Sequence, residues 1–240
     1  MSPSVWHGRW SELTRARRVN DLNIPALIAL FLPYHTTSHF PSALALVSQP
    51  NLLSTPFSAL IPARTSLAPL PLPDLIALLP PFSSVATSHA LLAFILRLPL
   101  PYLEAEEKPH RALIGFWLQV IAGYLERAGS TLPEGEKAAV LSTILEIVQL
   151  SRNQPDMLIA AYILLARYTL HYPFSAETSR VVMKTVVGNR AKRDIMDEEM
   201  ERAFLTTLVV VAQLGEEEIE VKEGKKFLGT SGWKALMRIE

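Results

Sequence analysis

The chain has 240 residues, no cysteine, and 23 basic and 23 acidic residues, so its formal net charge is zero. The lack of cysteine excludes disulfide scaffolds, thiolate zinc sites and cysteine nucleophiles. Zero net charge excludes the overall basicity of a protein that depends mainly on nucleic-acid phosphates, although local basic patches are still open. Because 49% of the residues are apolar and 19% are charged, the chain can build a core.

Proline and charge divide the chain into three parts. Fifteen of the 18 prolines lie in residues 1–109, and only three charged residues lie between Leu22 and Leu103. A regular middle and a strongly charged end follow. We therefore predict a proline-punctuated, apolar helical part at 1–103, HEAT-like helical pairs at 104–214, and a charged tail at 215–240 to which the pattern assigns no structure.

Membrane and targeting signals are weak throughout. A membrane span needs about 20 consecutive apolar residues, and no run in the chain is that long. The first 21 residues contain four arginines without an apolar stretch, unlike a secretory signal, and Glu12 and Asp21 argue against a mitochondrial transit peptide. The sequence predicts a soluble intracellular protein.

The proline-rich first part predicts short helices. Pro25 is expected in the first turn of a helix that reaches Leu32, because proline there loses no hydrogen bond, and Pro33 ends that helix. Further helices are predicted at about 38–47, 72–79 and 83–98. The prolines between them indicate ordered loops or polyproline turns.

The middle of the chain predicts five amphipathic helices, with starts near residues 110, 133, 155, 175 and 194. Gly129 marks one end, Pro155 and Asp156 mark a start, and Ser175 is a candidate cap. A spacing of about 20 residues, or about 40 for each pair, is typical of HEAT and armadillo repeats. We predict an all-α, HEAT/armadillo-like helical repeat (an α-solenoid) with a proline-rich irregular N-terminal part, and prefer it to an irregular helical bundle.

Catalytic and metal-binding patterns are not apparent. His35 and His39 stand four residues apart, but the sequence HTTSH lacks the glutamate of the HExxH zinc motif. Acidic runs at 104–107, 197–201 and 216–220 are typical of solvated faces. We predict no catalytic residue, metal, cofactor or small-molecule substrate; an enzyme would need a pocket that gathers His35 or His39 with distant acids.

Two basic clusters are candidates for secondary RNA contacts, since each could position a few phosphates. Taken alone, each cluster is more simply explained by cations that face water. The six candidate residues are Arg15, Arg17, Arg18, Arg190, Lys192 and Arg193.

Three segments resemble a known family. The first, RRVNDLNIPALIALFLPYHTTSHF at 17–40, follows a tryptophan and contains an apolar helix and a Leu-Pro-Tyr-His motif; the others are HRALIGFW at 110–117 and PDMLIAAYILLARY at 155–168. They resemble the N-terminal region of the U3 small nucleolar RNA-associated protein 10 family, the large HEAT-repeat proteins of the small-subunit processome. Positions of the first segment that match are Trp10, Arg17, Arg18, Asn23, Leu32, Pro33, Tyr34, His35 and Phe40.

The resemblance implies a non-enzymatic nucleolar scaffold in ribosome biogenesis that supports pre-18S ribosomal RNA processing and ribosomal DNA transcription. It implies β-propeller proteins of the early processome subcomplex as partners, together with pre-ribosomal RNA and U3 small nucleolar RNA. Because family members are much longer, we expect the chain to be a fragment, a truncated product or a divergent relative. The alternative is a generic helical-repeat adaptor, membrane-peripheral through its apolar first part.

Overall fold

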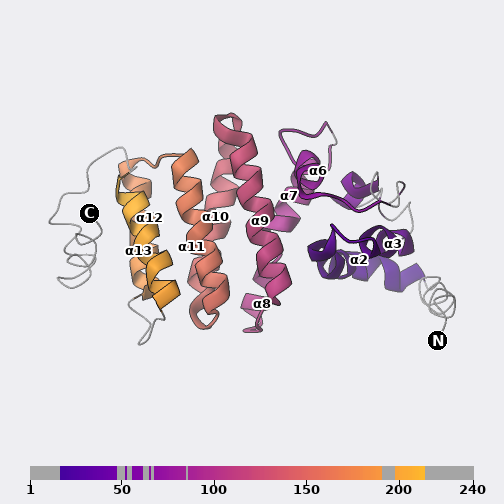
Figure 1. Ribbon diagram of the computed structural model, residues 1–240, viewed down its shortest axis with the longest axis horizontal. Coiled ribbons are helices and arrows are strands. Elements are labelled where there is room, and N and C mark those ends of the chain that lie inside the picture. Colours follow the sequence, from indigo (N-terminus) through magenta and orange to yellow (C-terminus); the bar gives the residue numbers. More distant parts are fainter. Residues whose placement is uncertain are drawn as a thin grey trace. The chain divides into compact units, whose positions relative to one another are not determined.

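A computed structural model describes residues 17–47, 52, 56–61, 65, 68–84, 86–190 and 198–213, and all regular secondary structure in these ranges is helical (Figure 1). The chain divides after Leu98 into two compact units. This division falls a few residues before the predicted boundary at 103, and helix α8 (Leu100–Glu104) contacts α10 of the second unit. The predicted tail at 215–240 lies outside the described residues. No helix within the described ranges is long and apolar enough to cross a membrane.

The first unit consists of short helices separated by proline-rich connections. Helices appear at the predicted places near 38–47 and 72–79, whereas the helix predicted from 83 begins at Ser88. The described elements are α2 (Arg17–Phe31), η1 (Leu32–Tyr34), α3 (His39–Leu46), η2 (Pro56–Leu60), α6 (Leu72–Ala77) and α7 (Ser88–Arg97).

The prediction for Pro25 was wrong. This residue lies inside α2, not in its first turn, because the helix already begins at Arg17. Proline in a helix interior removes one backbone hydrogen bond and is costly. Ile24 and Ile28 lie one turn apart on α2 and are both buried, so the apolar face of the helix offsets that cost. Pro33 does end the α-helix as predicted, since the chain continues as the 3₁₀ turn η1.

The described residues of the second unit form five long helices, and the first four start near the predicted residues 110, 133, 155 and 175. Gly129 follows the first helix with a positive φ of 49°, which confirms the predicted helix end. The Ser175 hydroxyl accepts a hydrogen bond from the Thr178 N–H at 3.4 Å, which confirms the predicted cap at the start of the fourth helix. The start predicted at Asp194 lies outside the described residues. The bounds are α9 (Arg111–Ala128), α10 (Glu134–Leu150), α11 (Pro155–His171), α12 (Ala176–Arg190) and α13 (Glu198–Gln213), with 3₁₀ turns η3 (Gly129–Thr131) and η4 (Ser151–Asn153).

These helices form two layers. Helix α11 packs against α9 and α13, while α12 packs against α10, and α10 also contacts α8. Helices α9, α11 and α13 therefore make one layer, in which they stand side by side (Figure 1), and α8, α10 and α12 make the other. Contacts of α10 with α11 and of α12 with α13 join the layers.

Helices within a layer run parallel. Near the starts of α9 and α11, Arg111 Nε lies 3.6 Å from Asp156 Oδ2, and near their ends Arg167 forms an ion pair with Glu126. In the other layer, the amide of Asn189 near the end of α12 donates to the Val148 carbonyl near the end of α10, at 2.5 Å. All helix starts of a layer consequently lie at one edge of the unit and all helix ends at the other.

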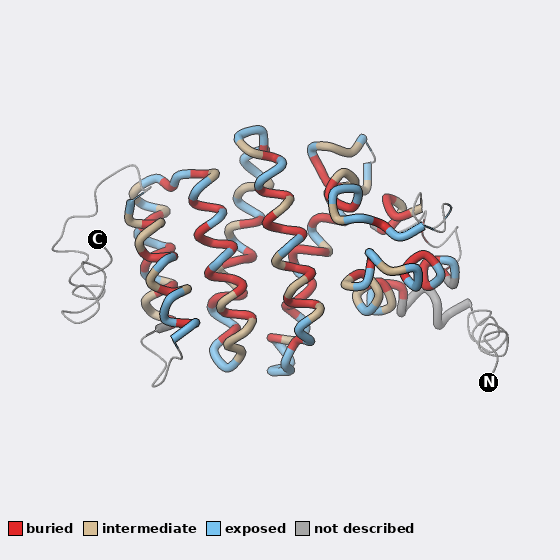
Figure 2. The backbone as a smooth tube through the Cα atoms, viewed as in Figure 1, coloured by how far each residue is buried: buried red, intermediate tan, exposed pale blue. Residues whose placement is uncertain are grey.

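The core of the unit lies between the layers, and α11 is its centre (Figure 2). Most of its residues from Met157 to Thr169 are buried. Helix α13 contributes a stripe of apolar residues, Met200, Phe204, Leu208 and Val211, all buried. The prediction of an all-helical protein is thus confirmed for the described residues.

Candidate functional site

His35 has a structural role. Its Nδ1 donates a hydrogen bond to the Leu70 carbonyl at 2.6 Å, and the Leu70 N–H donates to the His35 carbonyl at 2.8 Å. Burial lowers the pKa of His35 below its ordinary value, opposed by the bond to Leu70. The side chain therefore links the loop before α6 to the end of η1. This hydrogen bond explains the histidine of the Leu-Pro-Tyr-His motif without a metal ion.

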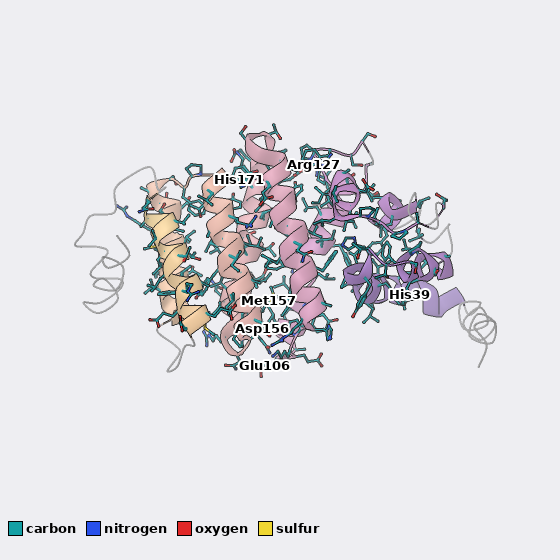
Figure 3. The ribbon with its side chains drawn as sticks, viewed as in Figure 1. His39, Glu106, Arg127, Asp156, Met157 and His171 are labelled. Atoms are coloured by element: carbon teal, nitrogen blue, oxygen red, sulfur yellow. The ribbon has the colours of Figure 1, made fainter. Side chains whose placement is uncertain are left out.

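The other histidines are dispersed. His39 is exposed at the start of α3. His171 lies at the end of α11, whereas Asp156 and Met157 lie at its start (Figure 3). His110 caps α9 by accepting the Ala112 N–H at 3.2 Å. Within the described ranges, no group of three histidine or acidic side chains could hold a metal ion.

The acidic runs face solvent where they are described. Glu104, Glu106 and Glu107 are exposed, as are Glu198, Glu199 and Glu201, so the prediction of solvated faces is confirmed for these six. The run at 216–220 lies outside the described residues. Acids also occupy the first turns of α10 and α12, where Glu134, Glu136 and Glu177 complement the positive ends of the helices.

The predicted basic clusters are only partly placed. Arg17 and Arg18 form the first residues of α2, and Arg190 is the last residue of α12; the description of these three covers the backbone alone. Arg15, Lys192 and Arg193 lie outside the described residues. The role of all six as RNA contacts stays a prediction.

Sequence reasoning missed an aromatic hollow of about 430 Å³ at the edge where α10 and α12 begin and α11 ends. Tyr168 and Tyr172 line it with ring centres 5.0 Å apart, and Phe174 stacks on Tyr168 at 5.7 Å. Lys137 Nζ lies 5.2 Å from the Tyr172 ring centre and 2.5 Å from Glu134 Oε1. The sequence signal is the aromatic-rich run YTLHYPF at 168–174, which spans the end of α11.

The tyrosine hydroxyls around this hollow hold helix ends in place. Tyr172 donates to the Gly129 carbonyl at 2.5 Å, Tyr168 to the Lys137 carbonyl at 3.1 Å, and Tyr124 to Glu136 Oε2 at 2.5 Å. Burial raises the pKa of Tyr124 and of Tyr168 above the ordinary range, and the bond to Glu136 adds to the effect on Tyr124. These phenols stay protonated and act as hydrogen-bond donors, so they are suited to structure and binding rather than to proton transfer.

Fold and site together define a helical protein whose second unit has two layers, with the aromatic hollow at one edge of them. No protein-family model matches the chain. The chain is nevertheless similar to curated fungal proteins named U3 small nucleolar RNA-associated protein 10.

The similarity is distant but extensive. The Aspergillus clavatus protein is 28% identical over 223 residues, which are 89% of this chain and 11% of that protein. The Aspergillus oryzae protein is 26% identical over 246 residues, 100% of this chain and 12% of the relative, and the Aspergillus terreus protein is 30% identical over 134 residues, 54% and 7%. The resemblance seen in the sequence is confirmed, and the chain spans about an eighth of the length of the relatives that it matches throughout.

Proposed function

We propose that this chain is a non-enzymatic helical scaffold in ribosome biogenesis, as part of the U3 small nucleolar ribonucleoprotein and the small-subunit processome. Its similarity over 89–100% of its length to several proteins named for association with U3 small nucleolar RNA carries this proposal. In this function the chain supports pre-18S ribosomal RNA processing and ribosomal DNA transcription in the nucleolus.

The two-layered unit supports a scaffold role. Alternating contacts between every second helix are what stacked HEAT-like pairs produce, because one pair cannot bury its apolar stripe alone. Helix faces and edges that point away from the core are then available to partners. We propose HEAT-like repeats of this kind for α8 to α13.

Protein contacts dominate in this proposal. The net charge of zero fits binding to protein partners, for which we propose β-propeller proteins of the early processome subcomplex. RNA contacts are secondary, and the proposed residues are Arg15, Arg17, Arg18, Arg190, Lys192 and Arg193.

The test is affinity purification of the tagged 240-residue chain from its own cells, followed by mass spectrometry and RNA sequencing. We expect processome subunits and 5′ spacer RNA to be recovered. Charge reversal of all six basic candidates should lower the RNA yield and leave the protein yield largely intact; reversal of exposed Arg111 and Arg202 serves as the control. Failure to recover processome subunits with a well-expressed, soluble chain would refute the proposal.

The competing function is a generic helical-repeat adaptor that is membrane-peripheral. The observation in its favour is the apolar first part, with three charged residues between Leu22 and Leu103. Localisation separates the two functions, since the scaffold requires a nucleolar signal and the adaptor a cytoplasmic or membrane-bound one.

A further inference from the structure

Two hollows lie along the boundary between α10 and α12, which run side by side in one layer. The aromatic hollow lies where both helices begin, and a second hollow of about 370 Å³ lies where both helices end. Arg152 in η4 and Lys184 in α12 line the second hollow, although they are 32 positions apart in the chain. This boundary, the α10–α12 seam, therefore has a hollow at each end.

Each helix turns a stripe of uncharged residues toward the seam. Members of a stripe recur every three or four positions, so they share one face of their helix, and all of them are at least partly exposed. Six of the eight line one of the hollows, whereas Leu145 and Val181 lie between the hollows on the same faces. Val181 is 54% exposed, so the described residues leave the middle of the seam uncovered. The stripes are Ala138, Leu141, Leu145 and Gln149 on α10, and Thr178, Val181, Thr185 and Gly188 on α12.

The charged side chains that line the hollows differ between the two ends of the seam. At the aromatic hollow, Lys137 is paired with Glu134, with 2.5 Å between Nζ and Oε1. At the second hollow, Arg152 and Lys184 are exposed, and no carboxylate in the described parts of the chain forms an ion pair with either of them. Charge complementarity therefore favours an occupant that is acidic at the second hollow and uncharged along the rest of the seam.

The middle of the seam favours a helix as the occupant. An extended segment exposes backbone N–H and carbonyl groups, which are costly to bury without partners. Leu145 and Val181 are apolar, and the Thr185 hydroxyl already donates to the Val181 carbonyl at 3.0 Å, so the seam offers such groups little. A helix forms its backbone hydrogen bonds internally and presents only side chains. A nucleic-acid strand would need cations along its length, whereas the eight stripe residues are uncharged.

We propose that the α10–α12 seam binds an amphipathic helix of a partner protein, which runs antiparallel to α10 and α12. Acidic side chains in the first turn of this helix pair with Arg152 and Lys184, and they also stabilise the positive end of their own helix. Its apolar face covers Leu145 and Val181. An apolar side chain near its end enters the aromatic hollow.

The separation of the hollows sets the spacing within the partner helix. Ala138 at the aromatic hollow and Gln149 at the second hollow are 11 positions apart on α10, which is about 16 Å at 1.5 Å per residue. The partner helix therefore carries its apolar anchor about 11 residues, or about three turns, after its acids. The inference rests on the proposed function, in which protein contacts dominate, and adds the surface and the chemical class of the partner segment.

Helix α11 already has this arrangement on another face of α10. It packs against α10, and the bond from Tyr168 to the Lys137 carbonyl joins its end to the start of α10, so the two helices are antiparallel. Pro155 and Asp156 form its first turn. Asp156 Oδ2 lies 3.6 Å from Arg111 Nε of the neighbouring helix α9. An acidic helix start that meets a cation at this edge is thus a contact that the unit itself makes.

The test is photo-crosslinking of the full chain in its own cells. A benzophenone amino acid replaces Val181 in the middle of the seam, and in a control chain it replaces Leu170, which is 61% exposed on α11. Mass spectrometry then identifies the peptide that is joined to each position. We expect position 181 to yield a processome peptide with acidic residues about one to two helical turns before the crosslinked residue, and position 170 to yield a different peptide or none.

Charge reversal tests the polar end of the seam. R152E/K184E should lower the yield of the crosslink at position 181 about tenfold, because two attractive contacts become repulsive. The matched variant R111E/R202E reverses two exposed cations on α9 and α13 and should leave that yield unchanged. Because reversal of Arg152 also affects the end of α10, K184E is tested alone as well and should lower the yield about threefold. Circular dichroism at the helix band checks that each variant folds.

The proposal is overturned by the lack of a crosslink at position 181 while processome subunits are recovered, by an RNA fragment or a peptide without acids at that position, or by an unchanged yield in folded R152E/K184E and K184E. In the first case the scaffold function still holds, since the subunits are recovered with the chain. Conversely, an acidic helix from a protein outside the processome would support the seam as a docking surface and refute the scaffold function.

Discussion

The position of α11 at the centre of the second unit makes a quantitative prediction for Leu165→Ala. Leu165 is fully buried on a helix that packs against α9, α10 and α13, so its neighbours cannot collapse into the space left by the smaller side chain. Loss of apolar burial and the remaining cavity together cost about 3 kcal/mol in such sites. Alanine regains only about 0.2 kcal/mol through its higher helix propensity.

The matched control is Leu170→Ala, the same substitution five residues later on the same helix. Leu170 is 61% exposed, so we expect its replacement to change the free energy of unfolding by less than about 0.5 kcal/mol. The assay is urea and thermal unfolding followed by circular dichroism at the helix band. The midpoint temperature should fall by about 6–12 °C for Leu165→Ala. Equal effects of the two substitutions would refute the assignment of the faces of α11.

Three further substitutions test single features through the same unfolding measurements. Thr207→Val removes a buried hydroxyl that donates to the Tyr162 and Ala203 carbonyls, both at 2.9 Å, and should cost about 0.5–1 kcal/mol; a neutral result would show that the bond is not formed. Gly129→Ala meets no steric obstacle but places a β-carbon at a φ of 49°, so a loss of about 1–2 kcal/mol is expected, and stabilisation would contradict that backbone conformation. Because the pKa of His35 is lowered in the folded state, its neutral form contributes stability above the unfolded value of 6.5, and this is lost as pH falls through the lower folded pKa. The variant His35→Gln should therefore lose less stability than the wild type between about pH 7.5 and pH 5, whereas parallel losses would exclude His35 as the source.

Local signals account for what the sequence predicted well. Pro155 and Asp156 mark the start of α11 because proline and an acid are favourable only in the first turn, whatever the tertiary structure. The stop at Gly129 is similarly local, since a positive φ favours glycine. Pro25 shows the limit of this reasoning, because α2 continues through a proline that local rules place at a helix start.

Contacts between distant parts of the chain could not be predicted. The hydrogen bonds between His35 and Leu70 span 35 positions, and no spacing rule connects a histidine in a turn with a carbonyl in a proline-rich loop. Arg152 and Lys184 meet at one hollow only because α10 and α12 run parallel in one layer. A sequence pattern gives the face of each helix but not which helix lies beside it, so the hollow emerged only from the packing.

The helix dipole explains the position of one of these two cations but not of the other. Arg152 lies just beyond the end of α10, where a positive charge stabilises the terminal carbonyls by about 0.3–1 kcal/mol. Lys184 lies six residues before the end of α12, outside the last turn to which that effect is confined. In urea unfolding, Arg152→Gln should therefore lower the stability of the chain by about 0.3–1 kcal/mol, whereas Lys184→Gln should leave it unchanged. If Lys184→Gln lowers stability as much as Arg152→Gln, the helix dipole does not explain the difference between the two positions, and both cations serve the fold.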